Sequence, residues 1–347
     1  FLDGGAVGGG FIFGLMFLLN ILYIYLVRHR IAFAVAMLEI VVDCIKLYPS
    51  TISVSIFGTI LQVFWIVLWV IGAGFALDDI QNSGQSDATG NFVYFFLVLS
   101  MFWTSQVIQN IVHVTVAGTL ATWYFLYPSS VPSNPTAKAL KRALTTSFGS
   151  ICFGSLIVAI VQTLRAMVQS ATSNSNEFVR CCAMCVMNCL EWIVQYFNIY
   201  AFTQVAIYGK TYCEAAKDTW NLFKSKGFDA IINDDLIGNV LSLGAAFGGV
   251  VVLGISLLMT TYGYDDVSSN DAAVWAVVGF VIGYILVICA MVVIRSAVAT
   301  LFVCFAEDPA AMADTKSELY QKLSGAWNKR YGDKVTCPGG GRGGGQY

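Results

Sequence analysis

The stretch from Ala272 to Phe305 reads AAVWAVVGFVIGYILVICAMVVIRSAVATLFVCF and contains one charged residue, Arg295. A helix needs about 20 consecutive apolar residues to cross the hydrocarbon core of a bilayer, so this stretch predicts a membrane-spanning helix. Six further apolar runs predict additional spans: Phe11–Val27, Ile52–Ala76, Phe92–Phe125, Leu144–Val168, Phe178–Tyr208 and Leu236–Tyr262. The sequence therefore predicts an all-α polytopic membrane protein, with about seven transmembrane helices in a transmembrane domain over residues 1–305.

The composition supports the same class of protein. Of the 347 residues, 57% are hydrophobic and 12% are charged, whereas a soluble domain carries about 25% charged residues. The net charge of −2 does not indicate a nucleic-acid partner. The chain starts at Phe1, and FLDGGAVGGG lacks the basic start of a signal peptide. We therefore expect an N-terminally incomplete chain.

The charged segments between the predicted spans sort onto two sides of the membrane. Basic residues gather in three segments: Arg28–Arg30, Lys138–Arg142 and Lys210–Lys226. Three other segments are polar or acidic and contain no lysine or arginine: 78–91, 170–177 and 262–271. Because basic loops stay in the cytoplasm, this pattern predicts a cytoplasmic C-terminus. Residues 306–347 are expected to form a cytoplasmic tail whose end, CPGGGRGGGQY, is disordered.

Two segments near the basic loops predict amphipathic helices that lie in the cytoplasmic interface rather than crossing the membrane, at about 31–47 and 210–226. In the first, the charged residues fall on one helical face, at steps of four and three: Glu39, Asp43 and Lys46. Pro49 fits the end of that helix. Assigning 31–47 to the interface keeps every basic segment on one side.

Four short motifs follow one another along the chain: ATWYF at Ala121–Phe125, FNIYA at Phe197–Ala201, AIYGK at Ala206–Lys210 and TLFVCFAEDP at Thr300–Pro309. In these motifs the chain resembles the choline transporter-like family, especially its fungal PNS1-like branch. The resemblance implies a ten-helix transporter with both termini in the cytoplasm, moving choline or related amines. The seven spans would then be its fourth to tenth helices, with the first three absent from this chain.

A quaternary ammonium substrate needs aromatic faces within about 6 Å, and a carboxylate can supply the counter-charge. One helical face in the run 92–125 offers such groups at steps of three, four and three: Trp103, Gln106, Asn110 and His113. Polar side chains on one face of a span point at a cavity or at another helix. They therefore predict either a substrate site or hydrogen bonding between helices.

The second candidate region surrounds Glu191, a carboxylate in the middle of a predicted span. Gln195 and Asn198 continue its face, and Tyr200 can supply an aromatic wall. Glu191 is a candidate counter-ion for a cation or a proton-coupling site. The structural alternative is a protonated Glu191, or one paired with another helix, for which Arg295 is a candidate.

These features predict a membrane transporter that moves choline or a related small organic cation by alternating access, in the plasma membrane or an organelle membrane. The alternative is a structural membrane subunit that acts with partner subunits in a larger complex. No Ser/His/Asp constellation supports an enzyme, and no cofactor is expected. Cys182, Cys185 and Cys189 share a helical face, but no second ligand cluster accompanies them, so we expect packing rather than a metal site.

Overall fold

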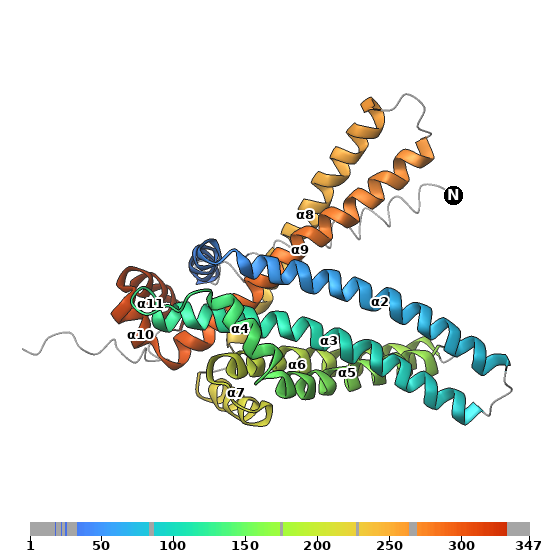
Figure 1. Cartoon of the computed structure of the whole chain (residues 1–347), viewed down its shortest axis with the longest axis horizontal. Helices are drawn as coiled ribbons and strands as arrows, with labels where there is room; N and C mark the ends of the chain where they lie inside the picture. Colours follow the sequence, from blue (N-terminus) through green and yellow to red (C-terminus); the bar gives the residue numbers. More distant parts are fainter. Residues whose placement is uncertain are drawn as a thin grey trace, which may run out of the picture.

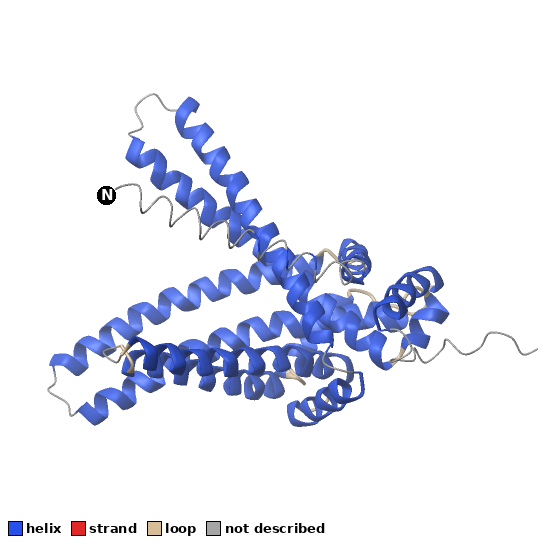
Figure 2. Cartoon of the chain, turned by 180° about the vertical axis from the view of Figure 1, so that it is seen from behind, coloured by secondary structure: helices blue, strands red, loops and turns tan. Residues whose placement is uncertain are grey.

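The computed structural model describes residues 33–82, 87–173, 176–226, 229–263 and 269–331, together with Leu18, Leu22 and Tyr25. Its described elements are all α-helices (Figure 2). Residues 33–47 form a helix, and ten more follow: α2 (Ser50–Asn82), α3 (Asp87–Leu126), α4 (Pro135–Leu144), α5 (Phe148–Ala171), α6 (Glu177–Tyr208), α7 (Tyr212–Lys226), α8 (Asp229–Gly263), α9 (Ser269–Glu307), α10 (Pro309–Thr315) and α11 (Ser317–Tyr331). The predicted span Phe11–Val27 lies almost wholly outside the described residues, as does the glycine-rich end of the chain.

Five of the described helices are long and apolar enough to cross a membrane, and they lie in α2, α3, α5, α8 and α9. By length and hydropathy, the described residues therefore contain fewer spans than the seven that the sequence predicts. The predicted span Phe178–Tyr208 is a continuous helix, α6, but is not among the five. Polar residues in its central turns, including Glu191 and Gln195, lower its hydropathy.

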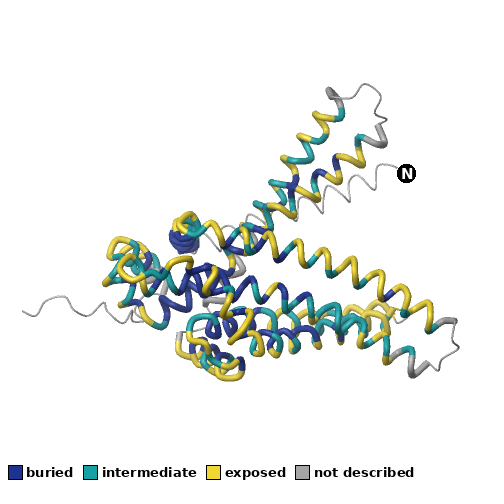
Figure 3. The backbone as a smooth tube through the Cα atoms, in the orientation of Figure 1, coloured by how far each residue is buried: buried dark blue, intermediate teal, exposed yellow. Residues whose placement is uncertain are grey.

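The outer surface of α2 is what a lipid environment requires. Large apolar side chains project from it over several turns, and Phe57, Phe64 and Phe75 are each more than 60% exposed. Figure 3 shows the exposed residues running along the length of α2. An apolar surface this extensive is unfavourable in water and is stable against lipid tails. The chain is thus an all-α membrane protein.

The long helices form a bundle and a divergent hairpin (Figure 1). Helices α2, α3, α5 and α6 run side by side, with α3 packed against both α5 and α6. The carboxyl half of α9 packs on α3, while its amino half pairs with α8 in a hairpin that points away from α2. Small residues permit the close α8–α9 pairing: a Cβ added to Gly283 would meet the carbonyl oxygen of Gly248 at 2.9 Å.

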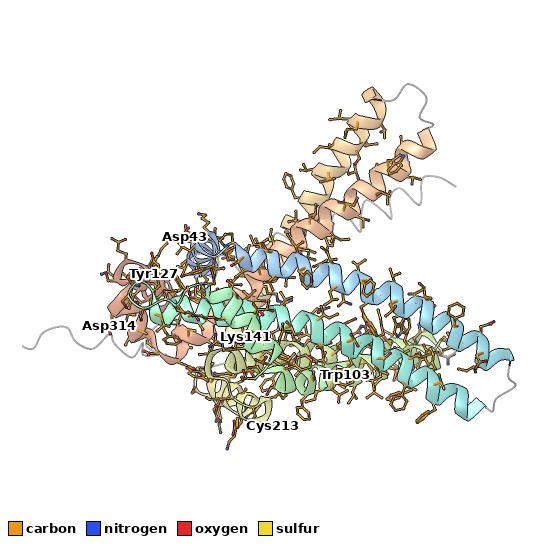
Figure 4. The ribbon with its side chains drawn as sticks, viewed as in Figure 1. Asp43, Trp103, Tyr127, Lys141, Cys213 and Asp314 are labelled. Carbon is orange, nitrogen blue, oxygen red and sulfur yellow. The ribbon has the colours of Figure 1, made fainter. Side chains whose placement is uncertain are left out.

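The short helices gather at one end of the bundle, where Figure 1 shows α4, α7, α10 and α11. We call this the basic end, because α4 and α7 carry the lysine-rich segments. Lys141 and Cys213 mark it in Figure 4. The carboxyl ends of α2 and α5 and the amino ends of α3 and α6 lie at the opposite end of the bundle. The sequence predicts that this end lies on the other side of the membrane from the lysine-rich segments.

The helix over residues 33–47 is amphipathic, as predicted, and it ends before Pro49. Glu39 and Asp43 are exposed, whereas Met37, Ile40 and other apolar residues are buried. Figure 1 shows this helix end-on while α2 runs across the view, so the two are steeply inclined. Its apolar face packs into the core cluster that includes residues of α3, α9 and α11. Protein, rather than lipid as expected, therefore covers this face.

The segment after α9, for which the sequence predicts a polar tail, begins with two helices. Residues 309–315 form α10 and residues 317–331 form α11. Met312 and Leu323 are fully buried in the main core. Lys322 pairs with Glu39, which joins α11 to the helix over residues 33–47. Buried apolar contacts anchor these two short helices to the basic end of the bundle.

Candidate functional site

Glu191 lies on α6 at the centre of a group of polar side chains between α5 and α6. Its Oε2 accepts a hydrogen bond from Nη1 of Arg165 at 2.8 Å. Its Oε1 accepts from the amides of Gln195 at 2.9 Å and Gln162 at 3.2 Å. The Glu191 side chain is 13% exposed, and that of Arg165 is 40% exposed. Three donors therefore stabilise a mostly buried negative charge.

A third helix joins the same group through Gln106 on α3. Its amide nitrogen donates to Oε1 of Gln162 at 3.3 Å, so side chains link α3 to α5 and α5 to α6. We call Gln106, Gln162, Arg165, Glu191 and Gln195 the polar network. The polar network includes three predicted site residues from two separate spans: Gln106 on α3, and Glu191 and Gln195 on α6.

Trp103 lies one turn before Gln106 on α3 and faces α5. Its indole nitrogen donates to the carbonyl oxygen of Cys152 at 3.0 Å. The side chain remains partly accessible, with 38% of the residue exposed. Figure 4 shows Trp103 beside α5, on the part of α3 that points away from the basic end. The hydrogen bond holds the ring edge and leaves an aromatic face available.

Asn110 and His113 are buried and have protein partners. Asn110 donates to Oγ of Ser155 on α5 at 2.9 Å. Nε2 of His113 lies 3.0 Å from the carbonyl oxygen of Ile199, and Nδ1 lies 2.9 Å from Oγ of Ser296. A carbonyl oxygen can only accept, so Nε2 carries a proton, and a neutral ring accepts from Ser296 at Nδ1. His113 thereby ties α3 to both α6 and α9.

Asn198 and Tyr200 turn toward other partners than the polar network. Asn198 accepts a hydrogen bond from the hydroxyl of Tyr212 on α7 at 2.9 Å. Burial raises the pKa of Tyr212 to about 12, which keeps its hydroxyl protonated as the donor. Tyr200 is 2% exposed and packs edge-on against Phe223, with ring centroids 5.1 Å apart. Both residues anchor α6 to the basic end of the bundle.

The sequence reasoning missed the charged partner of Glu191. Arg165, not Arg295, supplies the counter-charge, and Gln162 completes the link to α3. The available signal was Arg165 itself, an ionisable residue in an apolar run with Gln162 one turn before it. The two share a helical face, but only packing of α5 against α6 shows which carboxylate they meet.

A second polar contact, also missed, closes the basic end between α6 and α9. Glu307 accepts hydrogen bonds from the amide of Gln204 and the hydroxyl of Tyr208. Gln204 is fully buried. The sequence contained Glu307 within its last motif, but nothing in its spacing indicated a contact with residues about one hundred positions earlier.

Lys316 lies between α10 and α11, where aromatic rings and backbone carbonyl groups at the end of α3 surround its ammonium group. Its ammonium donates to the carbonyl oxygens of Tyr124 at 3.1 Å and Tyr127 at 3.0 Å. It also lies 4.7 Å from the ring centroid of Trp123. The positive charge thus meets the carbonyl-rich, electronegative end of a helix. Burial lowers the pKa of Lys316 to about 8.

The cysteine triplet on α6 does not assemble a metal centre in the described part of the chain. Cys182, Cys185 and Cys189 are exposed free thiols. Within the described ranges no three histidine, cysteine or acidic side chains come together as metal ligands.

Comparison with known proteins places these features in a family. Residues 11–310 match the family model described as plasma-membrane choline transporter. A CTL-like protein of Dictyostelium discoideum is 38% identical over 94% of this chain and 58% of its own length. The protein PNS1 of Debaryomyces hansenii is 38% identical over 85% of this chain and 62% of its own length. That of Cryptococcus neoformans is 33% identical over 91% and 61%.

The family match covers the bundle, the hairpin and the polar network, whereas Lys316 and Lys322 lie beyond its last matched residue. The chain spans about three fifths of the length of these curated relatives. The family model covers most of the chain, and the identities hold over nearly its full length. The chain therefore belongs to the choline transporter-like family, in its CTL/PNS1-like group.

Proposed function

We propose that this protein moves choline or a related small organic cation across a membrane by alternating access. In this proposal α6 is a sixth span, and the run Phe11–Val27 is a seventh. The helices over residues 33–47 and α7 lie at the cytoplasmic interface, on the transmembrane domain that we assign to residues 1–305. The segment 306–347 is then cytoplasmic, with α10 and α11 docked on the bundle.

The length and surface of α6 support its assignment as a span. Its 32 residues extend for about 48 Å, enough to cross a bilayer. Val186, Leu190 and Ile193 are each at least 47% exposed, which gives α6 an apolar outer face. Its polar residues meet donors on α5, so their presence is compatible with a position in the membrane.

The polar network is the observation that carries the proposal. An ionised carboxylate between membrane spans is costly, and such residues mark ion and substrate pathways. Glu191 has its charge satisfied by side chains of α5 and α6, and Gln106 links the group to α3. Three helices thus converge on one charge that a cationic substrate can use.

In the proposed mechanism Arg165 pairs with Glu191 when no substrate is bound. Its Nε is buried and has no hydrogen-bond partner among the described residues, so one N–H donor of the guanidinium is left without an acceptor there. An arriving organic cation displaces Arg165 toward its exposed side and takes Glu191 as counter-ion. Substrate and Arg165 then compete for one carboxylate, which couples occupancy to the packing of α5 against α6.

Aromatic faces near the polar network suit an ammonium without N–H donors. Trp103 offers a partly accessible ring on α3. Trp192 follows Glu191 on α6 and stacks on Tyr196 with ring centroids 5.7 Å apart. We assign substrate contact to Trp103, Gln106, Glu191 and Gln195. The other predicted site residues then hold the helices around them: Asn110, His113, Asn198 and Tyr200.

Uptake of radiolabelled choline into proteoliposomes of the full-length protein tests the proposal. Glu191→Gln is expected to reduce uptake to the level of empty liposomes, because the counter-charge is lost. Glu177→Gln, which makes the same change at an exposed position on α6, should transport normally. Wild-type uptake no higher than that of empty liposomes, or full uptake by Glu191→Gln, would refute this function.

The alternative, a structural subunit of a larger membrane complex, is favoured by one observation. Glu191 already has a counter-charge in Arg165, and His113 and Asn110 bond to neighbouring helices. Such bonding stabilises a helix bundle without any ligand. A stable co-purifying complex, together with no choline uptake, would support this alternative.

A further inference from the structure

An apolar groove lies between α2, α3 and α4, separate from the polar network. It holds about 390 Å³ and is lined mainly by apolar side chains, including Phe57, Leu61, Ile108 and Leu140. Helices α2 and α3 are candidate membrane spans, so the groove opens from a surface that faces lipid. At its polar end Oγ of Ser50 donates to the hydroxyl of Thr136 at 2.9 Å.

The groove has the polarity gradient of a lipid site. Its apolar walls follow α2 and α3, and its hydroxyl-bearing end lies at α4, where the short helices begin. A free phosphate or a soluble metabolite would gain little from walls that are almost entirely apolar. An acyl chain that leaves other lipid tails keeps apolar surroundings in this groove and gains close contacts with a fixed surface.

The positive charge of α4 favours anionic over zwitterionic lipids. Residues 127–147 include three basic side chains and no acidic one. Ala137 and Leu140 of α4 line the groove, and exposed Lys141 lies one turn after Ala137, about 40° around the helix. Exposed Lys138 is the next residue after Ala137.

The third basic side chain of α4, Arg142, lies away from the groove. A Cβ added to Gly118 of α3 would lie 3.4 Å from its Nη2, and Arg142 lines a separate small pocket with the last turn of α6. The basic residue that borders the groove is therefore Lys141, and Lys138 lies one turn before it, about 100° around the helix from Ala137. No acidic side chain of α4 is present to cancel their attraction for an anionic headgroup.

We propose that this groove binds one acyl chain of an anionic phospholipid, whose headgroup pairs with Lys138 and Lys141 on α4. The site is independent of the proposed transport function. It fixes α4, and thus the basic end of the bundle, to the charged surface of one membrane leaflet.

Native mass spectrometry of the full-length protein released from nanodiscs tests the site. The nanodiscs contain equal amounts of phosphatidylglycerol and phosphatidylcholine with identical acyl chains. Each lysine near a charged surface contributes about five-fold to attraction of an anionic lipid, so we expect a preference of about 25-fold. Lys138→Gln/Lys141→Gln should bring it close to parity. Lys217→Gln/Lys224→Gln on α7 makes the same charge change and should keep it.

Ala137→Trp fills the groove and should lower retention of both lipids, whereas Ala310→Trp, at an exposed position on α10, should not. If Ala137→Trp fails to fold, Ser53→Leu narrows the same groove. Equal retention of the two lipids by the wild type would overturn the proposal. So would retention of phosphatidylglycerol that is unchanged by the lysine or groove variants, since the lipid would then bind elsewhere on the protein.

Discussion

Breaking the Arg165–Glu191 pair from its two sides should have unequal costs. Arg165→Met leaves a carboxylate that is only 13% exposed with two amide donors and no counter-charge. Removing one partner of a buried pair costs about 3–5 kcal/mol, and we expect the lower end because the amides remain. Glu191→Gln instead leaves Arg165, which is 40% exposed and lies less than two turns before the end of α5, so its long side chain can extend toward the membrane surface. That loss should be about 1 kcal/mol, as for an exposed pair.

The double variant separates a true pair from two independent residues. Glu191→Gln/Arg165→Met removes both charges, so its free energy of unfolding should exceed that expected from the summed single losses by about 1–3 kcal/mol. Chemical unfolding of the full-length protein in detergent micelles measures all four species. Glu177→Gln and Arg180→Met, at exposed positions of α6, supply the matched control cycle. Additive losses, or an Arg165→Met variant as stable as Arg180→Met, would refute the pairing.

Three further predictions concern the basic end. The pKa of Lys316 is lowered to about 8 from an ordinary 10.5, so between these pH values the unfolded chain binds more protons and the stability of the fold rises with pH. Melting curves from pH 7.5 to 10.5 should show this rise in the wild type and not in Lys316→Met. A wild type whose stability does not rise over this range would contradict the burial of Lys316. Glu307→Gln should cost about 1.5–3 kcal/mol through its charge-assisted hydrogen bonds, whereas exposed Glu318→Gln should be neutral in the same unfolding assay. A maleimide at neutral pH should modify exposed Cys213 and spare Cys44, because burial raises the pKa of Cys44 to about 12. Peptide mass spectrometry measures the labelling of each cysteine, and rapid labelling of Cys44 would contradict its packing.

Several features of the fold were predictable because they depend on local chemistry. The apolar runs marked the five candidate spans, since hydropathy over about 20 residues decides membrane insertion. The steps of four and three in residues 31–47 predicted the amphipathic helix, and Pro49 its end. The lysine-bearing helices α4 and α7 lie at one end of the bundle, and the carboxyl ends of α2 and α5 lie at the other.

Other features depended on contacts that the sequence pattern does not encode. The polar content of α6 excluded it from the candidate spans, and only the structure shows that α5 supplies donors to Glu191. The apolar face of residues 33–47 predicted burial, but it could not reveal that protein covers this face. The helices α10 and α11 pack through Met312 and Leu323, and the overall polarity of their segment did not indicate this burial.

The sequence alone determined that this protein is a helical membrane protein of the choline transporter-like kind, and that Gln106, Glu191 and Gln195 are polar residues within apolar runs. Periodicity places side chains on a face of one helix, and it carries no information on the partner of that face. Tertiary structure decided that Glu191 meets Arg165 rather than Arg295, and that His113, Asn198 and Tyr200 bind neighbouring helices. The physical reason is that a charge within the bundle is stabilised by whichever donors packing brings within about 3 Å.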